Sequence, residues 1–121
     1  MNEKETSFYE DLESCGTEHY YRTTFMKDFV VTDGVNIMFE KLQCYWVGDI
    51  VASYIPTIMK LDSFFSVKVI VNDSKAIFTV DDGNGNVLVT QDIPYTDLKQ
   101  NLKMFLQYDE QNFVLMLPSE Y

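Results

Sequence analysis

Apolar and polar side chains alternate through much of the second half of the chain. This period of two is typical of strands that bury one face of a sheet. It is clearest at 64–71, where Phe65, Val67, Val69 and Val71 share one side. Similar runs predict four more strands, at 75–80, 87–93, 102–108 and 113–117.

A loop rich in turn residues, Asp81-Asp82-Gly83-Asn84-Gly85-Asn86, joins two of these strands. The dipeptide Asn84-Gly85 tolerates the positive φ angles of a type I′ turn, so we predict a hairpin of that type here. The other predicted strands are expected to lie on either side of this hairpin.

The period becomes helical after Thr32-Asp33-Gly34, where Thr32 or Asp33 is placed to cap a helix. Apolar residues then recur at helical spacing at Val35, Met38, Phe39 and Leu42. A second helix is predicted over 45–55, with Pro56 as its end. Gln43 and Cys44 separate the two, which leaves open two helices or one bent helix.

Together these elements predict an α+β fold, an N-terminal helical pair packed on one face of an antiparallel β-meander of about five strands. The run Phe29-Val30-Val31 is a further short strand candidate. The other sheet face carries Lys68 and Lys103 but also Ile70 and Ile77, so we expect a partner or a second copy to cover part of it. We expect a flexible acidic tail over 1–15 and a single domain over 16–121.

The chain of 121 residues carries a net charge of −10. Residues 1–18 hold six acids and one base, and residues 62–121 hold nine acids and four bases, so each of these stretches contributes −5. Phosphate contacts need clustered lysine and arginine, so we expect no direct binding to nucleic acid. Solubility explains such acidity, and the functional alternative is an acidic face that occupies a basic groove on another protein.

The sequence predicts a cytoplasmic protein. No apolar run approaches the roughly 20 residues of a membrane helix, and the first residues lack the pattern of a signal peptide. Cys15 and Cys44 lie far apart and are expected to remain reduced thiols.

We predict neither a cofactor nor a metal. The spacing Asp82-x-Asn84-x-Asn86 resembles the start of a calcium loop, but Val87 and Ile93 occupy the positions that need glycine and glutamate. One histidine and two distant cysteines do not suit zinc. No glycine-rich phosphate-binding string is present.

The sequence favours a protein that is not an enzyme. His19 is the only histidine, and a Cys15–His19 pair four residues apart would need a helix that Gly16 disfavours. Acidic pairs such as Asp81/Asp82 and Asp109/Glu110 are expected in turns of so acidic a chain, so they carry little weight as a glycosidase site.

Aromatic and charged residues predict a surface that binds a partner. Tyrosine, tryptophan and arginine are enriched at interface hot spots. The candidates are His19, Tyr20, Tyr21, Arg22, Tyr45 and Trp46, together with the acidic Asp81 and Asp82 of the hairpin loop. For Trp46, packing in the core is the competing interpretation.

The chain resembles a domain-of-unknown-function family of small proteins from bacteria, plasmids and phages. The strings that carry the resemblance are Gly16-Thr17-Glu18-His19-Tyr20-Tyr21-Arg22, Thr32-Asp33-Gly34-Val35, Tyr45-Trp46, Asp49-Ile50-x-Ala52-Ser53-Tyr54, Asp82-Gly83-Asn84-Gly85-Asn86-Val87-Leu88, Gln91-Asp92-Ile93-Pro94-Tyr95-Thr96-Asp97 and Leu117-Pro118-Ser119-Glu120-Tyr121. The resemblance implies a mobile-element or accessory-gene setting, with no activity or catalytic residue to transfer.

The sequence therefore favours a non-enzymatic protein-binding protein. One form of this hypothesis is a phage or mobile-element factor that inhibits a host nucleic-acid-handling defence machine. Its partner would then be a basic nucleic-acid-binding protein that receives acidic groups in place of phosphates. The alternatives are a small enzyme with an unrecognised site and a self-associating structural module, for example a homodimer.

Overall fold

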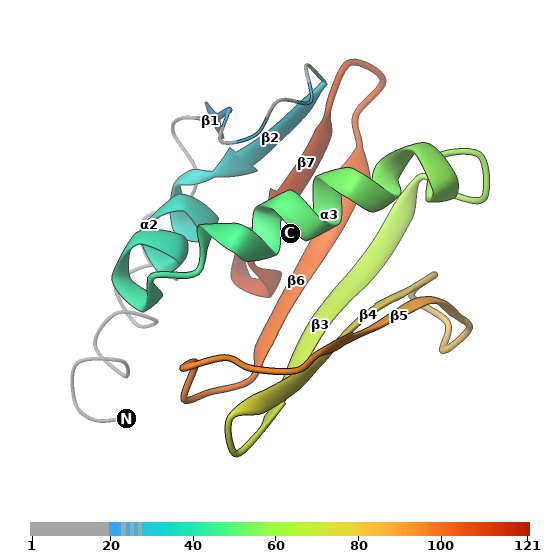
Figure 1. Cartoon of the computed structure of the whole chain (residues 1–121). Helices are drawn as coiled ribbons and strands as arrows, with labels where there is room; N and C mark the ends of the chain where they lie inside the picture. Colours follow the sequence, from blue (N-terminus) through green and yellow to red (C-terminus); the bar gives the residue numbers. More distant parts are fainter. Residues whose placement is uncertain (1–19, 23, 25, 27) are drawn as a thin grey trace.

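The computed structural model describes residues 20–22, 24, 26 and 28–121. This part of the chain forms strands, helices and a short 3-10 helix (Figure 1). In chain order they are β1 (Tyr20–Tyr21), β2 (Phe29–Thr32), α2 (Asp33–Leu42), α3 (Tyr45–Ile58), β3 (Phe64–Asn72), β4 (Lys75–Asp81), β5 (Val87–Ile93), β6 (Leu102–Tyr108), β7 (Phe113–Met116) and η1 (Pro118–Glu120). The predicted tail at 1–15 lies outside the described residues.

These strands join one mixed sheet in the order β1-β2-β7-β6-β3-β4-β5. Most neighbours are antiparallel, but β2 runs parallel to β7. The segment after β5 crosses the end of the β3–β4 hairpin, where the Thr96 amide donates to the Ser74 carbonyl at 2.7 Å. The Val71 amide likewise donates to Asn101 Oδ1 at 2.8 Å. After this crossing β6 pairs with β3, and not with β5, which precedes it in the chain.

The α+β class is confirmed, whereas the predicted arrangement is wrong in three respects. The helices are not N-terminal, because β1 and β2 precede them. The sheet has seven strands among the described residues, and it is not a simple antiparallel meander. The reason is that β2 is buried on both faces and its exposed neighbour β1 has only two residues, so neither shows the alternation of a half-buried strand.

Two separate helices follow β2. Thr32 is the N-cap of α2, and its hydroxyl oxygen accepts a hydrogen bond from the Val35 amide at 3.3 Å. Gln43 adopts a left-handed conformation with φ of 57°, which ends α2. The Cys44 amide then donates to the Phe39 carbonyl at 2.9 Å, so the chain turns before α3 begins.

The prediction that Pro56 ends the second helix is wrong, because α3 continues to Ile58. A proline removes only its own amide donor, and the later Met59 amide still bonds the Ile55 carbonyl at 2.9 Å. Ile58 is fully buried, so its packing favours one more turn of helix.

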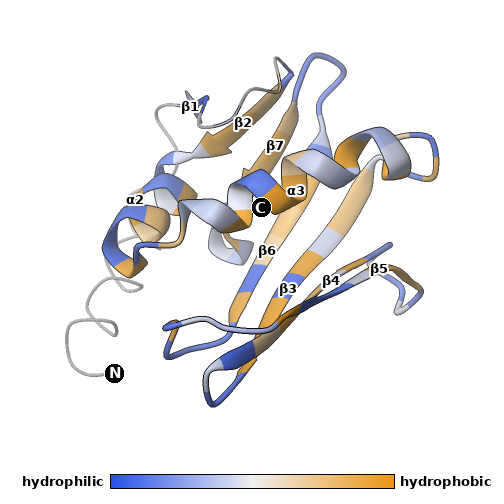
Figure 2. Cartoon of the chain, viewed as in Figure 1, coloured by the Kyte–Doolittle hydropathy of each residue, from blue (hydrophilic) through white to orange (hydrophobic). Residues whose placement is uncertain are grey.

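The core lies between α3 and one face of the sheet (Figure 1). Val47, Val51, Ile55 and Ile58 line the buried side of α3 and are at most 1% exposed. β3 and β6 alternate between hydrophobic and hydrophilic residues beneath the helix (Figure 2), whereas β2 and β7 are buried throughout. The alternation in β3 and β6 is that of a sheet with one face buried against helices.

The chain's own C-terminus covers part of the opposite, outer face of the sheet. The Tyr121 ring lies 5.1 Å from the Phe64 ring and 5.4 Å from the Phe105 ring, measured between centroids. Phe105 in turn packs on a small buried cluster formed by Val30, Val114 and Met116. Nearer β5 the same face stays open, since Ile70 and Ile77 are 44% and 45% exposed.

Candidate protein-binding surfaces

Tyr20, Tyr21 and Arg22 lie at one exposed edge of the sheet, as expected for a binding surface. β1 pairs with β2 so that Tyr21 lies opposite Val31, close to the start of α2. A hydrogen bond to the Asp33 carboxylate raises the pKa of the Tyr21 hydroxyl, with smaller contributions from burial and the negative charge of Asp33. His19 lies outside the described residues.

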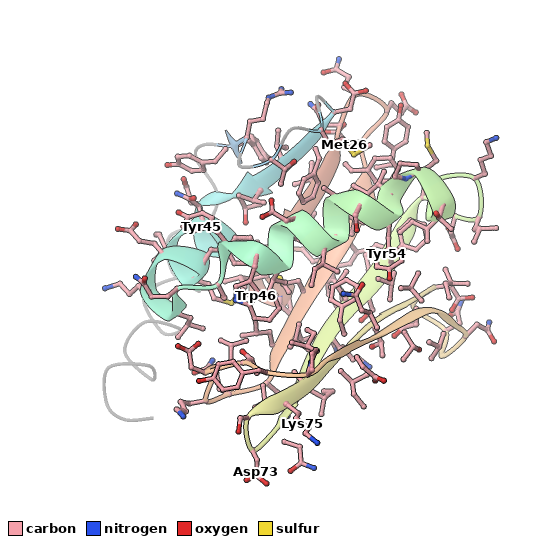
Figure 3. The ribbon with its side chains drawn as sticks, viewed as in Figure 1. Met26, Tyr45, Trp46, Tyr54, Asp73 and Lys75 are labelled. Atoms are coloured by element: carbon pink, nitrogen blue, oxygen red, sulfur yellow. The ribbon has the colours of Figure 1, made fainter. Side chains whose placement is uncertain are left out.

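Tyr45 and Trp46 begin α3 and serve mainly to pack the two helices (Figure 3). The Tyr45 hydroxyl donates to Asn36 Oδ1 at 2.9 Å, and its ring meets Phe39 edge-on with centroids 5.6 Å apart. Trp46 is half-buried and packs against the main core. The structure therefore supports core packing for Trp46, while 40% of Tyr45 stays exposed.

The Asp82 carboxylate stabilises the hairpin loop through hydrogen bonds within it. It accepts hydrogen bonds from the amides of Asn84 and Asn86 at 2.8 and 3.2 Å, and from Asn86 Nδ2 at 2.8 Å. The bond from the Asn86 side chain is the largest cause that lowers the pKa of Asp82, and the backbone bonds add to it. The Asp82 carboxylate, predicted to bind a partner, therefore accepts hydrogen bonds within its own loop.

The predicted type I′ turn is wrong, because a longer loop replaces it. Positive φ angles occur at Gly83 and Gly85, with values of 84° and 91°, and not at Asn84. The loop is closed by a 3.2 Å hydrogen bond from the Asp82 amide to the Asn86 carbonyl. The Asp82 side chain bonds inside this wider loop and so favours it over a two-residue turn.

Asp81 is almost buried, with 7% exposed. Its Oδ1 accepts a hydrogen bond from the Gly83 amide at 2.8 Å, and its Oδ2 lies 3.9 Å from Lys68 Nζ. This carboxylate is therefore a structural part of the loop base and offers little charge to a partner.

The predicted site residues do not form one surface. β1 carries Tyr20 and Tyr21, whereas β4 and its loop carry Asp81 and Asp82. Five strand intervals separate β1 from β4 in the sheet, roughly 24 Å at ~4.8 Å for each interval. A partner of ordinary size would have to span most of the sheet to touch both groups.

Sequence reasoning missed an acidic end of the molecule, which consists of Asp28, Asp62, Asp82, Asp109 and Glu110. They come from segments that the topology brings to the same end of the sheet. The Phe113 amide bonds the Asp28 carbonyl at 2.7 Å, and the Tyr108 amide bonds the Ser63 carbonyl at 2.8 Å. Gly83 lies beside the Phe64 ring at the start of β3, which places the Asp82 loop at this end too.

The carboxylates of the acidic end are not neutralised by the described lysines and arginines. Lys60 is the only base in the described segments 28, 59–64, 81–87 and 108–113. None of the five carboxylates forms an ion pair with a described residue. Asp28, Asp62, Asp109 and Glu110 are exposed, so this end presents concentrated negative charge to solvent.

A second feature that the sequence did not predict is a clasp between the C-terminus and the start of α2. Glu120 Oε1 accepts from the Thr32 hydroxyl at 2.6 Å and from the Leu117 amide at 2.9 Å, and Oε2 accepts from the Gly34 amide at 3.2 Å. A Cβ on Gly34 would lie 2.7 to 2.8 Å from side-chain atoms of Glu120 and Leu117, so any larger residue would force these side chains to shift. Two strings of the family resemblance, at 32–35 and 117–121, meet here.

No group of three or more histidine, cysteine, aspartate or glutamate side chains among the described residues is placed to hold a metal ion. Burial raises the pKa of the Cys44 thiol to about 12, which disfavours the reactive thiolate. Cys15 and His19 both lie outside this part of the chain. None of the described helices combines the length and hydrophobicity needed to cross a membrane.

Comparison with known proteins connects the chain to one family. No curated protein and no solved structure matches it. A family model described as "Family of unknown function (DUF6876)" matches residues 8–121, nearly the whole chain. This match confirms the resemblance to a domain of unknown function that the sequence strings predict. The chain therefore belongs to the Family of unknown function (DUF6876).

Proposed function

We propose that this protein is a non-enzymatic protein-binding protein whose acidic end engages a basic surface on another protein. The observation that carries the proposal is the gathering of five carboxylates at one end of the sheet without ion-pair partners among the described residues. Like charges repel one another, and a basic partner would relieve that repulsion. The net charge of −10 would also steer such a partner during encounter.

The spacing of the acidic end suits a partner that normally holds nucleic acid. Its carboxylates follow or precede β2, β6, β7, β3 and β4, which are neighbours in the sheet. Four intervals of ~4.8 Å span roughly 19 Å. At ~3.4 Å for each nucleotide, this is about the length of five or six nucleotides of one strand. A groove that binds phosphates along such a length is the partner surface we propose.

The biological setting we propose is a phage, mobile element or accessory gene, with a host nucleic-acid-handling protein as the target. Inhibition then follows from competition, since the acidic end and nucleic acid need the same basic groove. We propose a cytoplasmic location for this encounter. Its affinity should fall as salt rises, because screening weakens attraction between exposed charges.

The experiment compares three tagged forms of the full chain in lysate from native host cells. The first is the unchanged protein, and the second carries Asp28→Asn, Asp62→Asn and Glu110→Gln at the acidic end. The third carries Glu40→Gln, Asp49→Asn and Asp97→Asn, three exposed acids outside the acidic end. Proteins recovered at low and high salt are identified by mass spectrometry.

We expect the unchanged and third forms to recover the same basic nucleic-acid-binding protein, and the second form to lose it. Recovery should fall at high salt, and added DNA or RNA should displace the protein. Equal recovery by the second and third forms would contradict a role for the acidic end. Recovery only of proteins that neither bind nucleic acid nor respond to salt would contradict the proposed partner class.

A further inference from the structure

We propose that two copies of the chain pair through β5, in antiparallel orientation, to form a two-fold dimer with one continuous sheet. This interaction surface lies along β5 and meets the acidic end only at the Asp82 loop, and it does not depend on the proposed function. The free edge of β5, the register of its side chains and the charges at its two ends support this pairing.

The free edge is the first argument. β5 is the last strand in the sheet, and no described strand pairs with it on the side away from β4. Natural edge strands commonly carry lysine, proline or a bulge that prevents edge-to-edge pairing. In β5 the irregularity lies near the start, since Val80 faces Val89 but Asp81 faces Val87. From Val89 to Ile93 the strand is regular and contains neither lysine nor proline.

The register is the second argument, because β5 is complementary to itself when the two-fold axis passes through Thr90. Thr90 then lies opposite its own copy, and threonine pairs across antiparallel strands are favourable. The next pair is Val89 with Gln91, and the ladder ends there because Leu88 is the extra residue of the β5 irregularity. Asp92, the only charged residue of β5, therefore lies two positions from the axis and does not face its own copy.

Charge at the two ends of β5 is the third argument. The start of β5 adjoins the loop that contains Asp82, and its end adjoins Lys75, because Ala76 pairs with Ile93. Lys75 lies at the β3–β4 turn and is exposed (Figure 3). Antiparallel pairing brings the Asp82 loop of each copy to the same end of the interface as Lys75 of the other, three strand intervals or roughly 14 Å across the sheet at ~4.8 Å for each interval. It also points the two acidic ends in opposite directions, which limits the repulsion between two chains of net charge −10.

The outer face of the sheet beside β5 supplies apolar surface at the proposed dimer interface. Ile77 on β4 is 45% exposed and Ile70 on β3 is 44% exposed. With Pro94 and Asp92 they contribute to the lining of an open hollow of about 550 Å³. In the dimer one such hollow lies on each side of the axis. Exposed apolar surface of this kind favours association.

The first test is the mass of the full chain in solution as a function of concentration. Analytical ultracentrifugation should show a mass near 14.1 kDa in dilute solution that rises toward twice this value as the concentration increases. Thr90→Lys places two ammonium groups opposite each other on the axis, so this variant should remain a monomer. The matched control is Thr57→Lys, an exposed threonine on α3, which should dimerise like the unchanged chain.

The second test reports the register itself. In a chain that carries Cys15→Ser, the variant Thr90→Cys should form a disulfide-linked dimer under mild oxidation, and Thr57→Cys should not. Cys44 is fully buried and does not interfere. A mass that stays at the monomer value at every concentration would overturn the proposal. A dimer that survives Thr90→Lys, or a Thr90→Cys chain that cross-links no faster than Thr57→Cys, would overturn it too.

Discussion

The hydroxyl of Thr32 lies 2.6 Å from the carboxylate of Glu120, although 88 positions separate these residues. The same carboxylate accepts hydrogen bonds from the amides of Gly34 and Leu117. One side chain thus joins the N-cap of α2 to the last segment of the chain. This relationship makes the C-terminus part of the fold.

We expect Glu120→Ala to lower the free energy of unfolding by about 1–3 kcal/mol, because the Thr32 hydroxyl and the Leu117 amide lose their acceptor. Thr32 is only 2% exposed, so water cannot fully replace that acceptor. Urea unfolding measures the effect. Ser119→Ala, at an exposed neighbouring position, is the control and should change stability by less than about 0.5 kcal/mol. Equal stability of the two variants would show that the clasp contributes nothing.

Gly34→Ala should also destabilise the protein, by about 1–3 kcal/mol, although alanine is the better helix former. The new methyl would lie 2.7 Å from Glu120 Oε1 and 2.8 Å from Leu117 Cδ1. In the double variant with Glu120→Ala the cost should be smaller than the sum of the two single changes, because one of the two clashes is removed. Thermal or urea unfolding of the four proteins gives this coupling. Strict additivity would argue against the clash.

The Asp82 loop should give a pH-dependent contribution to stability. The folded-state pKa of Asp82 is lowered below its ordinary value of 3.8, so the contribution of its carboxylate to the free energy of unfolding is present above the unfolded pKa. It is lost as pH falls through the folded pKa. The stability difference between the unchanged chain and Asp82→Asn should therefore shrink below about pH 4. Asp97→Asn, at an exposed acid outside the loop, is the control. A difference that stays constant down to acid pH would contradict this linkage.

Cys44 should resist thiol reagents in the folded protein. It is 0% exposed, and burial raises its pKa from 9.0 to about 12. A chain with Cys15→Ser should react with a disulfide reagent only after unfolding in urea. The folded-state pKa of Cys44 is higher than its unfolded-state pKa. The contribution of the buried, neutral thiol to the free energy of unfolding is therefore complete below about pH 9 and is lost as pH rises toward 12. Rapid reaction of the native variant at neutral pH would contradict the burial of this thiol.

Tyr54 ties α3 to β5, because its hydroxyl donates to Gln91 Oε1 at 2.7 Å and its ring stacks on Phe78 at 6.0 Å. Tyr54→Phe keeps the ring and removes the hydrogen bond, so we expect a loss of about 0.5–1.5 kcal/mol. Tyr95→Phe, at a side chain that is 73% exposed, should have almost no effect. Urea unfolding compares the two, and equal stabilities would show that the hydrogen bond contributes nothing.

Most strand and helix positions, although not that of β1, could be predicted from the sequence to within a few residues. The runs at 64–71, 75–80, 87–93, 102–108 and 113–117 correspond to β3, β4, β5, β6 and β7. Alternation and helical spacing are local patterns, which is why they suffice for this level of structure. The end of α3 could not be predicted from Pro56, because the buried Ile58 outweighs the lost amide donor.

The candidate site could be predicted only in part. Tyr20, Tyr21 and Arg22 are exposed, and their role in binding a partner stays a prediction, whereas Asp81 is used inside the fold. The acidic end went unpredicted because its carboxylates lie in separate turns along the chain. Negative charge is evident from composition, whereas its position depends on which strands become neighbours.

The sequence by itself determined the element types, most of their boundaries and the large excess of negative charge. These properties depend on residues a few positions apart, or on a simple count. The tertiary structure alone decided that β2 lies parallel to β7, that β6 lies beside β3 and that β5 is left at the edge. It also decided that Glu120 reaches Thr32 and Gly34. Each of these depends on burial and hydrogen bonding between distant segments, and no local pattern of side chains specifies which distant segment becomes the partner.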